Sequence, residues 1–224
     1  MSKDLGIYSS SLRGFGTYWI PLEAVLLTLV GAGVVRLLLS TETWLGYLSL
    51  AFWVYLPFVA LSLNKLSLSD YGLTLSGWRR GLAWFGLSVL IVLVPFVVIA
   101  QLLVTVLTKQ PGGTGLALPG FAEVLYGLVL VVIPEEMFFR GFLQTRISTW
   151  TNSIGITSAV PAILFTAVLF TLAHLVVEPD LIRAGVILPG LVMGWLRHKS
   201  GGALAPIGFH WLANLAAYAV LAPT

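Results

Sequence analysis

The chain has 224 residues, of which 58% are hydrophobic and 9% are charged, with a net charge of +3 and a mean hydropathy of +0.97. A soluble domain carries roughly 25% charged residues, so this composition excludes a soluble globule. It also excludes disorder, which requires low hydrophobicity. The 12 basic residues are scattered along the chain, and we therefore expect no nucleic-acid partner.

Continuous apolar runs predict an all-α fold, a polytopic transmembrane helical bundle embedded in the lipid bilayer, because a β-barrel would show weak alternation instead. We expect about seven spans, within a range of six to eight. In chain order they lie near 17–39, 45–64, 81–108, 121–146, 156–177, 181–197 and 203–222. A further short helix or re-entrant segment is an alternative for 109–120 or 147–156. The whole chain, 1–224, is predicted to be a single membrane domain.

The basic residues indicate the topology of these spans, because Lys and Arg favour cytoplasmic loops. They predict a multi-pass membrane protein, in the cell membrane if the organism is prokaryotic, with a cytoplasmic N-terminus and an external C-terminus. We expect no removable signal before the first span. The residues that carry this topology are Lys3, Arg13, Lys65, Arg79, Arg80, Arg146, Arg197 and Lys199.

Two adjacent carboxylates lie inside the fourth predicted span, where every ionisable group suggests a function. Glu136 and Arg140 are four residues apart, so they meet on one helix face and form an ion pair. Glu135 is rotated by about 100° and lacks that partner, which suits a general base. Pro134 is expected to loosen the helix just before the pair. An ion-pair cluster that only fixes helix packing is the structural alternative.

Two histidines lie on later spans. His174 closes the segment Phe170–His174, whereas His210 and Asn214 project from one face of the last span. With Glu135 they supply a base, a partner for it and two oxyanion donors, the groups that amide hydrolysis requires. His174 lies four residues before Glu178, nearer the outer face than Glu135. A tilted fifth span or a cavity reached from 174–180 would bring the two together.

Three motifs therefore occur in order on separate spans: EEMFFR at 135–140, FTLAH at 170–174 and HWLAN at 210–214. Together they resemble the signature of the CPBP intramembrane proteases, the family of CAAX proteases and bacteriocin-processing enzymes. The stretches SDYGL at 69–73 and LVMGWLRHKSGG before the third motif are similar to the same family. The resemblance covers residues 65–218. Within it, Gly190 and Gly194 form a G-x-x-x-G pair that predicts close helix packing.

The resemblance implies a CAAX-protease-like endopeptidase that hydrolyses a peptide bond of a membrane-associated protein or peptide. A prenylated C-terminal peptide, a bacteriocin leader and a membrane-anchored sorting tail are all compatible with it. It implies that Glu135 activates a water with the aid of His174, and that His210 and Asn214 stabilise the oxyanion. The supporting residues that it implies are Glu136, Arg140 and Phe170.

We expect no cofactor, because Asn214 on the face of His210 suits a pair of donors better than a pair of ligands. A zinc-dependent version of the protease would use Glu135, His174 and His210 as ligands with a water in the fourth position. A proton-coupled transporter with Glu135, Glu136 and His174 as its relay is the alternative from another class. The chain shows no repeated halves of the kind that such transporters have. A non-catalytic scaffold is the third interpretation.

Overall fold

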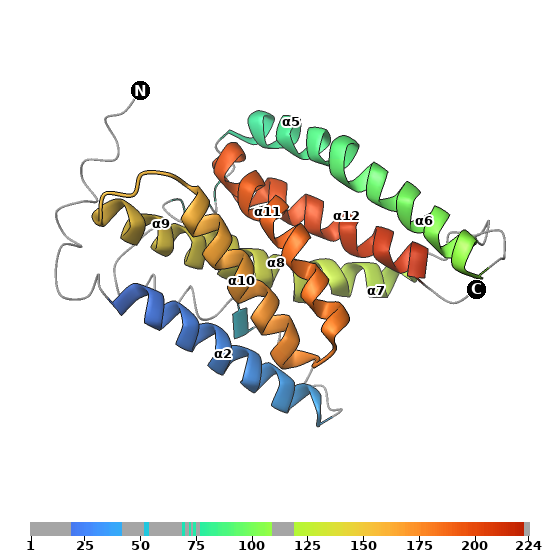
Figure 1. The fold of residues 1–224 in the computed structure, drawn as a ribbon, viewed down its shortest axis with the longest axis horizontal. Helices are drawn as coiled ribbons and strands as arrows, with labels where there is room; N and C mark the ends of the chain where they lie inside the picture. The colour runs from blue at the N-terminus through green and yellow to red at the C-terminus, as the bar shows by residue number, and fades with distance from the viewer. Residues whose placement is uncertain are drawn as a thin grey trace.

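The computed structural model describes residues 19–41, 52–53, 69, 72, 74, 77–108 and 119–221. All regular structure in these ranges is helical, and the helices pack side by side (Figure 1). The expected all-α fold is therefore confirmed for this part of the chain. Of the predicted span 45–64, only 52–53 belong to the described residues.

Six continuous helical stretches are present among the described residues. The first is α2 (Ile20–Leu39). In the second, α5 (Trp78–Ser88) runs through a π-helical segment (Val89–Leu93) into α6 (Val94–Thr108). The third, which carries the two adjacent glutamates, runs from Phe121 to Ser153. Its parts are α7 (Phe121–Tyr126), a π-helical segment (Gly127–Val132), α8 (Ile133–Glu136), a second π-helical segment (Met137–Leu143) and α9 (Gln144–Ser153).

The last three stretches follow each other as antiparallel neighbours. Helix α10 (Val160–Val177) leads through a 3₁₀ segment (Leu181–Val186) into α11 (Ile187–Ser200). Gly201 then adopts a left-handed conformation, with φ of 78°, which ends α11 and lets α12 (Leu204–Leu221) turn back. Helix α10 packs against both α2 and α11, and α11 packs against α5 and α12. This places α10 and α11 in the middle of the bundle (Figure 1).

Prolines explain why two of the long helices widen into π-helical turns. Pro95 and Pro134 each follow such a turn, and proline cannot donate the hydrogen bond that continues an α-helix. The backbone N–H of Ile133 donates to the carbonyl oxygen of Leu128, five residues earlier, which is the π-helical spacing. The helix thus continues through Pro134, in agreement with the expected loosening of the backbone there.

The third stretch corrects one predicted boundary. The sequence predicts its inner end near residue 146, but the helix continues to Ser153. Arg146 therefore lies within the helix, and its Nη2 contacts Oε2 of Glu23 on α2 at 2.5 Å. The helix continues because Ile147 and Thr151 are buried, and packing against α10 stabilises a segment that is too polar to be predicted from hydropathy.

The predicted close packing around Gly190 and Gly194 is confirmed. A Cβ atom on Gly194 would lie 3.0 Å from Cγ2 of Ile163, and one on Gly190 would lie 3.5 Å from Cβ of Ala167. Both neighbours belong to α10. The two glycines therefore allow the backbone of α11 to approach α10 more closely than any larger residue would.

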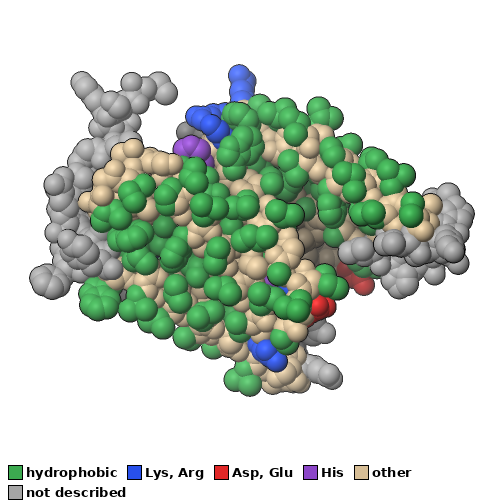
Figure 2. Space-filling model, in the orientation of Figure 1, with side chains coloured by type: hydrophobic (Ala, Val, Ile, Leu, Met, Phe, Trp, Pro, Cys, Tyr) green, Lys and Arg blue, Asp and Glu red, His purple; other side chains and the backbone are tan. Residues whose placement is uncertain are grey.

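Many large hydrophobic side chains of the described helices are exposed on the surface of the bundle. Hydrophobic side chains dominate the visible face, with Lys, Arg and His at its upper edge and further charged groups near the lower ends of α2 and α10 (Figure 2). Three helices are long and apolar enough to cross a membrane: Ile20–Leu39, Trp78–Leu103 and Val160–Val177. A shorter apolar helix spans Leu204–Val220.

Candidate active site

A buried ion pair lies at the centre of the site. Nη1 of Arg140 lies 3.1 Å from Oε1 of Glu136, and both side chains are completely buried. The predicted pairing four residues apart is therefore confirmed. Arg140 is also held by two aromatic rings, with its Cζ 4.3 Å from the centroid of Phe170 and 5.8 Å from that of Phe139. Its Nη2 donates to the carbonyl oxygen of Gly190 at 3.4 Å.

His210 lies between the two glutamates. Its Nδ1 is 2.9 Å from Oε1 of Glu136, a hydrogen-bond distance, and its Nε2 is 3.8 Å from Oε2 of Glu135. The buried Oε2 atoms of Glu135 and Glu136 both have no hydrogen-bond partner among the described residues. The two glutamates thus differ, since Glu136 contacts both Arg140 and His210 at 3.1 Å or less, whereas Glu135 has the longer contact with His210.

Phe170 connects the separate parts of the site. Its ring centroid lies 4.4 Å from that of His174 and 5.9 Å from that of His210. Nδ1 of His174 lies 2.9 Å from the carbonyl oxygen of Phe170, one turn earlier on α10. If this nitrogen carries the proton, it donates to the carbonyl and leaves Nε2 as an acceptor. Helix α10 therefore orients His174 through its own backbone.

A cavity of about 170 Å³ joins Glu135 and His174. Its walls come from α2, α8 and the π-helical segment after it, and the end of α10, and Trp53 contributes to the same wall. The cavity extends to Glu178 and Arg183 in the connection between α10 and α11. This answers the question of depth, because a cavity reached from that connection is one of the two arrangements expected from the sequence. The lining residues are Val35, Trp53, Glu135, Phe139, Ala173, His174, Val177, Glu178 and Arg183.

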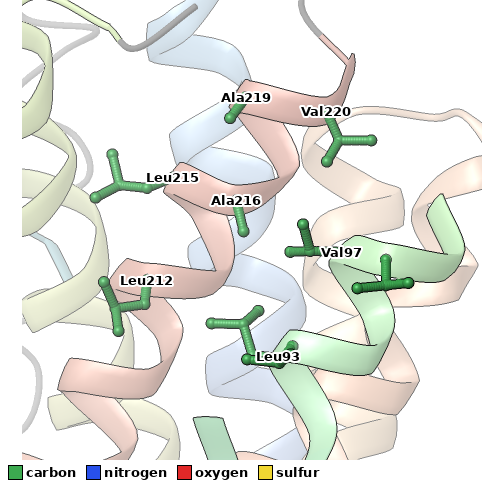
Figure 3. A pocket seen from close by; sticks show the side chains of 9 residues that line it. Leu93, Val97, Leu212, Leu215, Ala216, Ala219 and Val220 are labelled. Carbon is green, nitrogen blue, oxygen red and sulfur yellow. The ribbon is translucent and has the colours of Figure 1, made fainter. Parts of the chain in front are cut away.

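A second hollow, of about 420 Å³, lies between α6 and α12 and is lined by apolar side chains alone (Figure 3). Leu93 and Val97 face Leu212 and Ala216 of α12 across it. On α12, Leu212 is rotated by about 200° from His210, so this hollow lies on another side of the helix. Its walls hold no group that can transfer a proton.

Asn214 is not brought into the buried cluster. It lies one turn after His210 on α12, as expected, but its side chain is exposed, whereas His210 is buried. The other six predicted site residues are close neighbours or line the same cavity. Within the described part of the chain, no three His, Asp or Glu side chains come together in an arrangement that would hold a metal ion.

Two supporting side chains, Gln144 and Arg197, are not among the site residues predicted from the sequence. Gln144 is buried, and its Nε2 donates to the carbonyl oxygen of Gly194 at 2.9 Å. The sequence places Arg197 in a loop as a topology residue, but it lies within α11, and its Nε donates to the carbonyl oxygen of Arg140 at 3.2 Å. Its guanidinium packs on Gly72, where a Cβ atom would lie only 2.2 Å from Nη2. The glycine in SDYGL was the available signal for this contact.

Comparison with known proteins agrees with this geometry. Residues 117–216 match the family model described as type II CAAX prenyl endopeptidase Rce1-like. No curated protein and no solved structure matches the chain. The matched range contains the third helical stretch, α10, α11 and most of α12, and therefore every residue of the buried cluster.

The helical bundle, its apolar surface and its buried glutamate–histidine cluster define an intramembrane peptidase of the CAAX-protease type. Residues 117–216 form a domain of the Rce1-like family of type II CAAX prenyl endopeptidases, also called the CPBP family. This is the family that the three motifs resemble.

Proposed function

We propose that the protein is an intramembrane endopeptidase in which Glu135 activates a water that hydrolyses a peptide bond of a membrane-associated protein or peptide. One observation carries this proposal. Glu135 lines the same cavity as His174, whereas Glu136 does not line it and is bound by Arg140 and His210. A carboxylate with a free lone pair beside an imidazole is the arrangement that general-base activation of water requires.

In the proposed reaction, the water oxygen attacks the carbonyl carbon while Glu135 accepts one of its protons. The tetrahedral intermediate then breaks at the C–N bond, and the protonated Glu135 delivers its proton to the departing amine. His174 accepts a hydrogen bond from the attacking water through Nε2, because Phe170 holds its Nδ1. Each proton taken from the water is thereby returned, and Glu135 ends the cycle ionised.

Stabilisation of the oxyanion falls to α12 in this proposal. His210 is held against Glu136 through Nδ1, so its Nε2 lies on the side of Glu135, where it serves as the donor to the reacting carbonyl. Asn214 is exposed one turn away, so its amide is free to turn toward the substrate as the second donor. Glu136, Arg140 and Phe170 fix the position of the imidazole and make no contact with the substrate.

We propose further that no bound metal takes part in the reaction. The donors of α12 support this version, because an oxyanion held by His210 and Asn214 leaves no step that needs a Lewis acid. The zinc-dependent version would use Glu135, His174 and His210 as ligands. The name of the matching family suggests a prenylated C-a-a-X peptide as the first substrate to test.

The decisive experiment compares Glu135→Gln with the wild type on a farnesylated C-a-a-X peptide, with the products identified by mass spectrometry. Loss of a general base typically lowers the rate by about 10²–10⁴-fold, and we expect at least this loss with an unchanged fold. Activity is expected to survive a chelator. Near-normal cleavage by Glu135→Gln contradicts the assigned base, and zinc-dependent loss and recovery of activity contradicts the metal-free version.

A further inference from the structure

The mouth of the catalytic cavity carries a charged pair. Nη2 of Arg183 lies 2.5 Å from Oε2 of Glu178, and both side chains line the cavity that contains Glu135 and His174. Asp180 holds the local backbone, since its Oδ1 accepts from the N–H of Ile182 and its carbonyl oxygen from the N–H of Arg183. Arg183 therefore lies in a hydrogen-bonded turn at the start of the 3₁₀ segment that follows α10.

This pair is weak enough to exchange its carboxylate. The side chains of Arg183 and Glu178 are 44% and 57% exposed, and exposed ion pairs contribute little to stability. The other nearby cation is already engaged, because Nη1 of Arg36 donates to the carbonyl oxygen of Val176 at 3.0 Å. Among the described residues that line the cavity, Arg183 is thus the single cation.

The space between this rim and the glutamate is small and mostly apolar. The cavity of about 170 Å³ has Val35, Phe139, Ala173 and Val177 in its walls. Such walls suit apolar side chains, whereas the guanidinium at the mouth suits a carboxylate, which it binds with two parallel hydrogen bonds. A short apolar peptide that ends in a free carboxylate complements both features.

We propose that Arg183 binds the C-terminal carboxylate of the substrate, which replaces Glu178 as its partner while an apolar side chain close to that carboxylate occupies the cavity. This inference rests on the proposed function, because it takes Glu135 as the place of cleavage. Arg183 then acts as a specificity-determining residue that selects bonds near a free C-terminus. Glu178 competes with the substrate for the same guanidinium.

The competition gives a signature that a purely structural ion pair does not have. Removal of the cation in Arg183→Gln weakens binding of a carboxylate, whereas Glu178→Gln frees Arg183 and strengthens it. A pair that only stabilised the turn would respond to both substitutions in the same direction. Arg80→Gln is the matched control, because Arg80 is exposed near the start of α5, at the opposite end of α11 from Arg183.

The experiment measures binding without turnover. The probe is the apolar tripeptide Val-Leu-Leu with a free carboxylate, compared with its carboxamide, and the protein is the full chain with Glu135→Gln. We expect the acid to bind at least about tenfold more tightly than the amide. Arg183→Gln is expected to reduce this acid-to-amide ratio of affinities to about one. Glu178→Gln is expected to increase the ratio, and Arg80→Gln to leave it unchanged.

Cleavage of farnesylated C-a-a-X peptides with acid and amide ends supplies the second measurement, as a ratio of kcat/KM values in the protein that retains Glu135. Equal binding of the acid and amide tripeptides, or equal loss of both in Arg183→Gln, overturns the carboxylate site. Inactivity of the wild type toward both farnesylated peptides, with the binding ratio intact, contradicts the proposed function with this substrate and leaves the carboxylate site standing.

Discussion

Glu136 and Arg140 form a completely buried ion pair, and this burial determines how strongly a neutral residue at position 136 destabilises the protein. Glu136→Gln leaves the charge of Arg140 without its counter-charge, and loss of one partner of a buried pair typically costs about 3–5 kcal/mol. We therefore expect this variant to unfold at markedly lower temperature in detergent, as measured by circular dichroism.

The matched control is Glu178→Gln, which also removes one carboxylate from an arginine pair. Because that pair is exposed, its loss is expected to change the free energy of unfolding by no more than about 1 kcal/mol. A stable but inactive Glu136→Gln beside an active Glu135→Gln would show that the roles of the two glutamates are reversed.

Asn214 provides a separate residue-scale prediction, because it is exposed while its neighbour His210 is buried. Removal of one oxyanion donor typically lowers kcat by about 10²–10³-fold. We expect this loss for Asn214→Ala, with the melting temperature unchanged since no buried contact is removed. Single-turnover cleavage measures the effect, and an undiminished rate would exclude Asn214 from the oxyanion site.

At the scale of elements, α2 contributes a wall of the site through its close contact with Trp53. A Cβ atom on Gly31 would lie 2.9 Å from the rings of Phe52 and Trp53, and Trp53 in turn packs on Phe138 with a centroid distance of 4.6 Å. The small residue on α2 therefore sets the position of an aromatic ring that lines the catalytic cavity.

Gly31→Ala is expected to destabilise the protein by about 1–3 kcal/mol, because an added methyl in a packed core forces neighbouring rings to move. Gly33→Ala is the control on the same helix, since a Cβ atom added there would have no neighbour within 4 Å. It is expected to be neutral or slightly stabilising through helix propensity. Equal melting temperatures for the two variants would contradict the tight contact at Gly31.

At the scale of the whole molecule, charged side chains lie at the upper and lower edges of the apolar surface (Figure 2). Basic residues alone, Arg79, Arg80 and Lys199, lie where α5 begins and α11 ends, whereas the other end carries Arg36 and Arg183 together with Glu178 and Asp180. The predicted topology places the first group in the cytoplasm.

The chain contains no cysteine, so single introduced cysteines report topology without background. With a membrane-impermeant maleimide on intact cells, Asp180→Cys is expected to be labelled and Arg79→Cys to be labelled only after lysis. Both positions are exposed in the structure. The reverse pattern would invert the topology and place the mouth of the catalytic cavity on the cytoplasmic side.

Several structural features of this protein could be predicted from the sequence alone, because the periodicity of a helix determines which side chains lie on one of its faces. Apolar runs predicted the all-helical architecture, though not the polar continuation of the third stretch to Ser153, and the spacing of Glu136 and Arg140 predicted their ion pair. The G-x-x-x-G pair determined the close approach of α10 and α11. Each of these features depends on residues within one or two turns of a single helix.

Only the tertiary structure decided which groups from different helices meet. In the structure, Nδ1 of His210 is within hydrogen-bond distance of Glu136 and not of Glu135. Glu135 and His174 line one cavity instead of contacting each other directly. The tertiary structure also brought Arg197 to the carbonyl oxygen of Arg140, 57 residues away in sequence, and left Asn214 exposed. These outcomes depend on how the helices tilt and pack, and helix periodicity carries no information about the rotation of one helix relative to another.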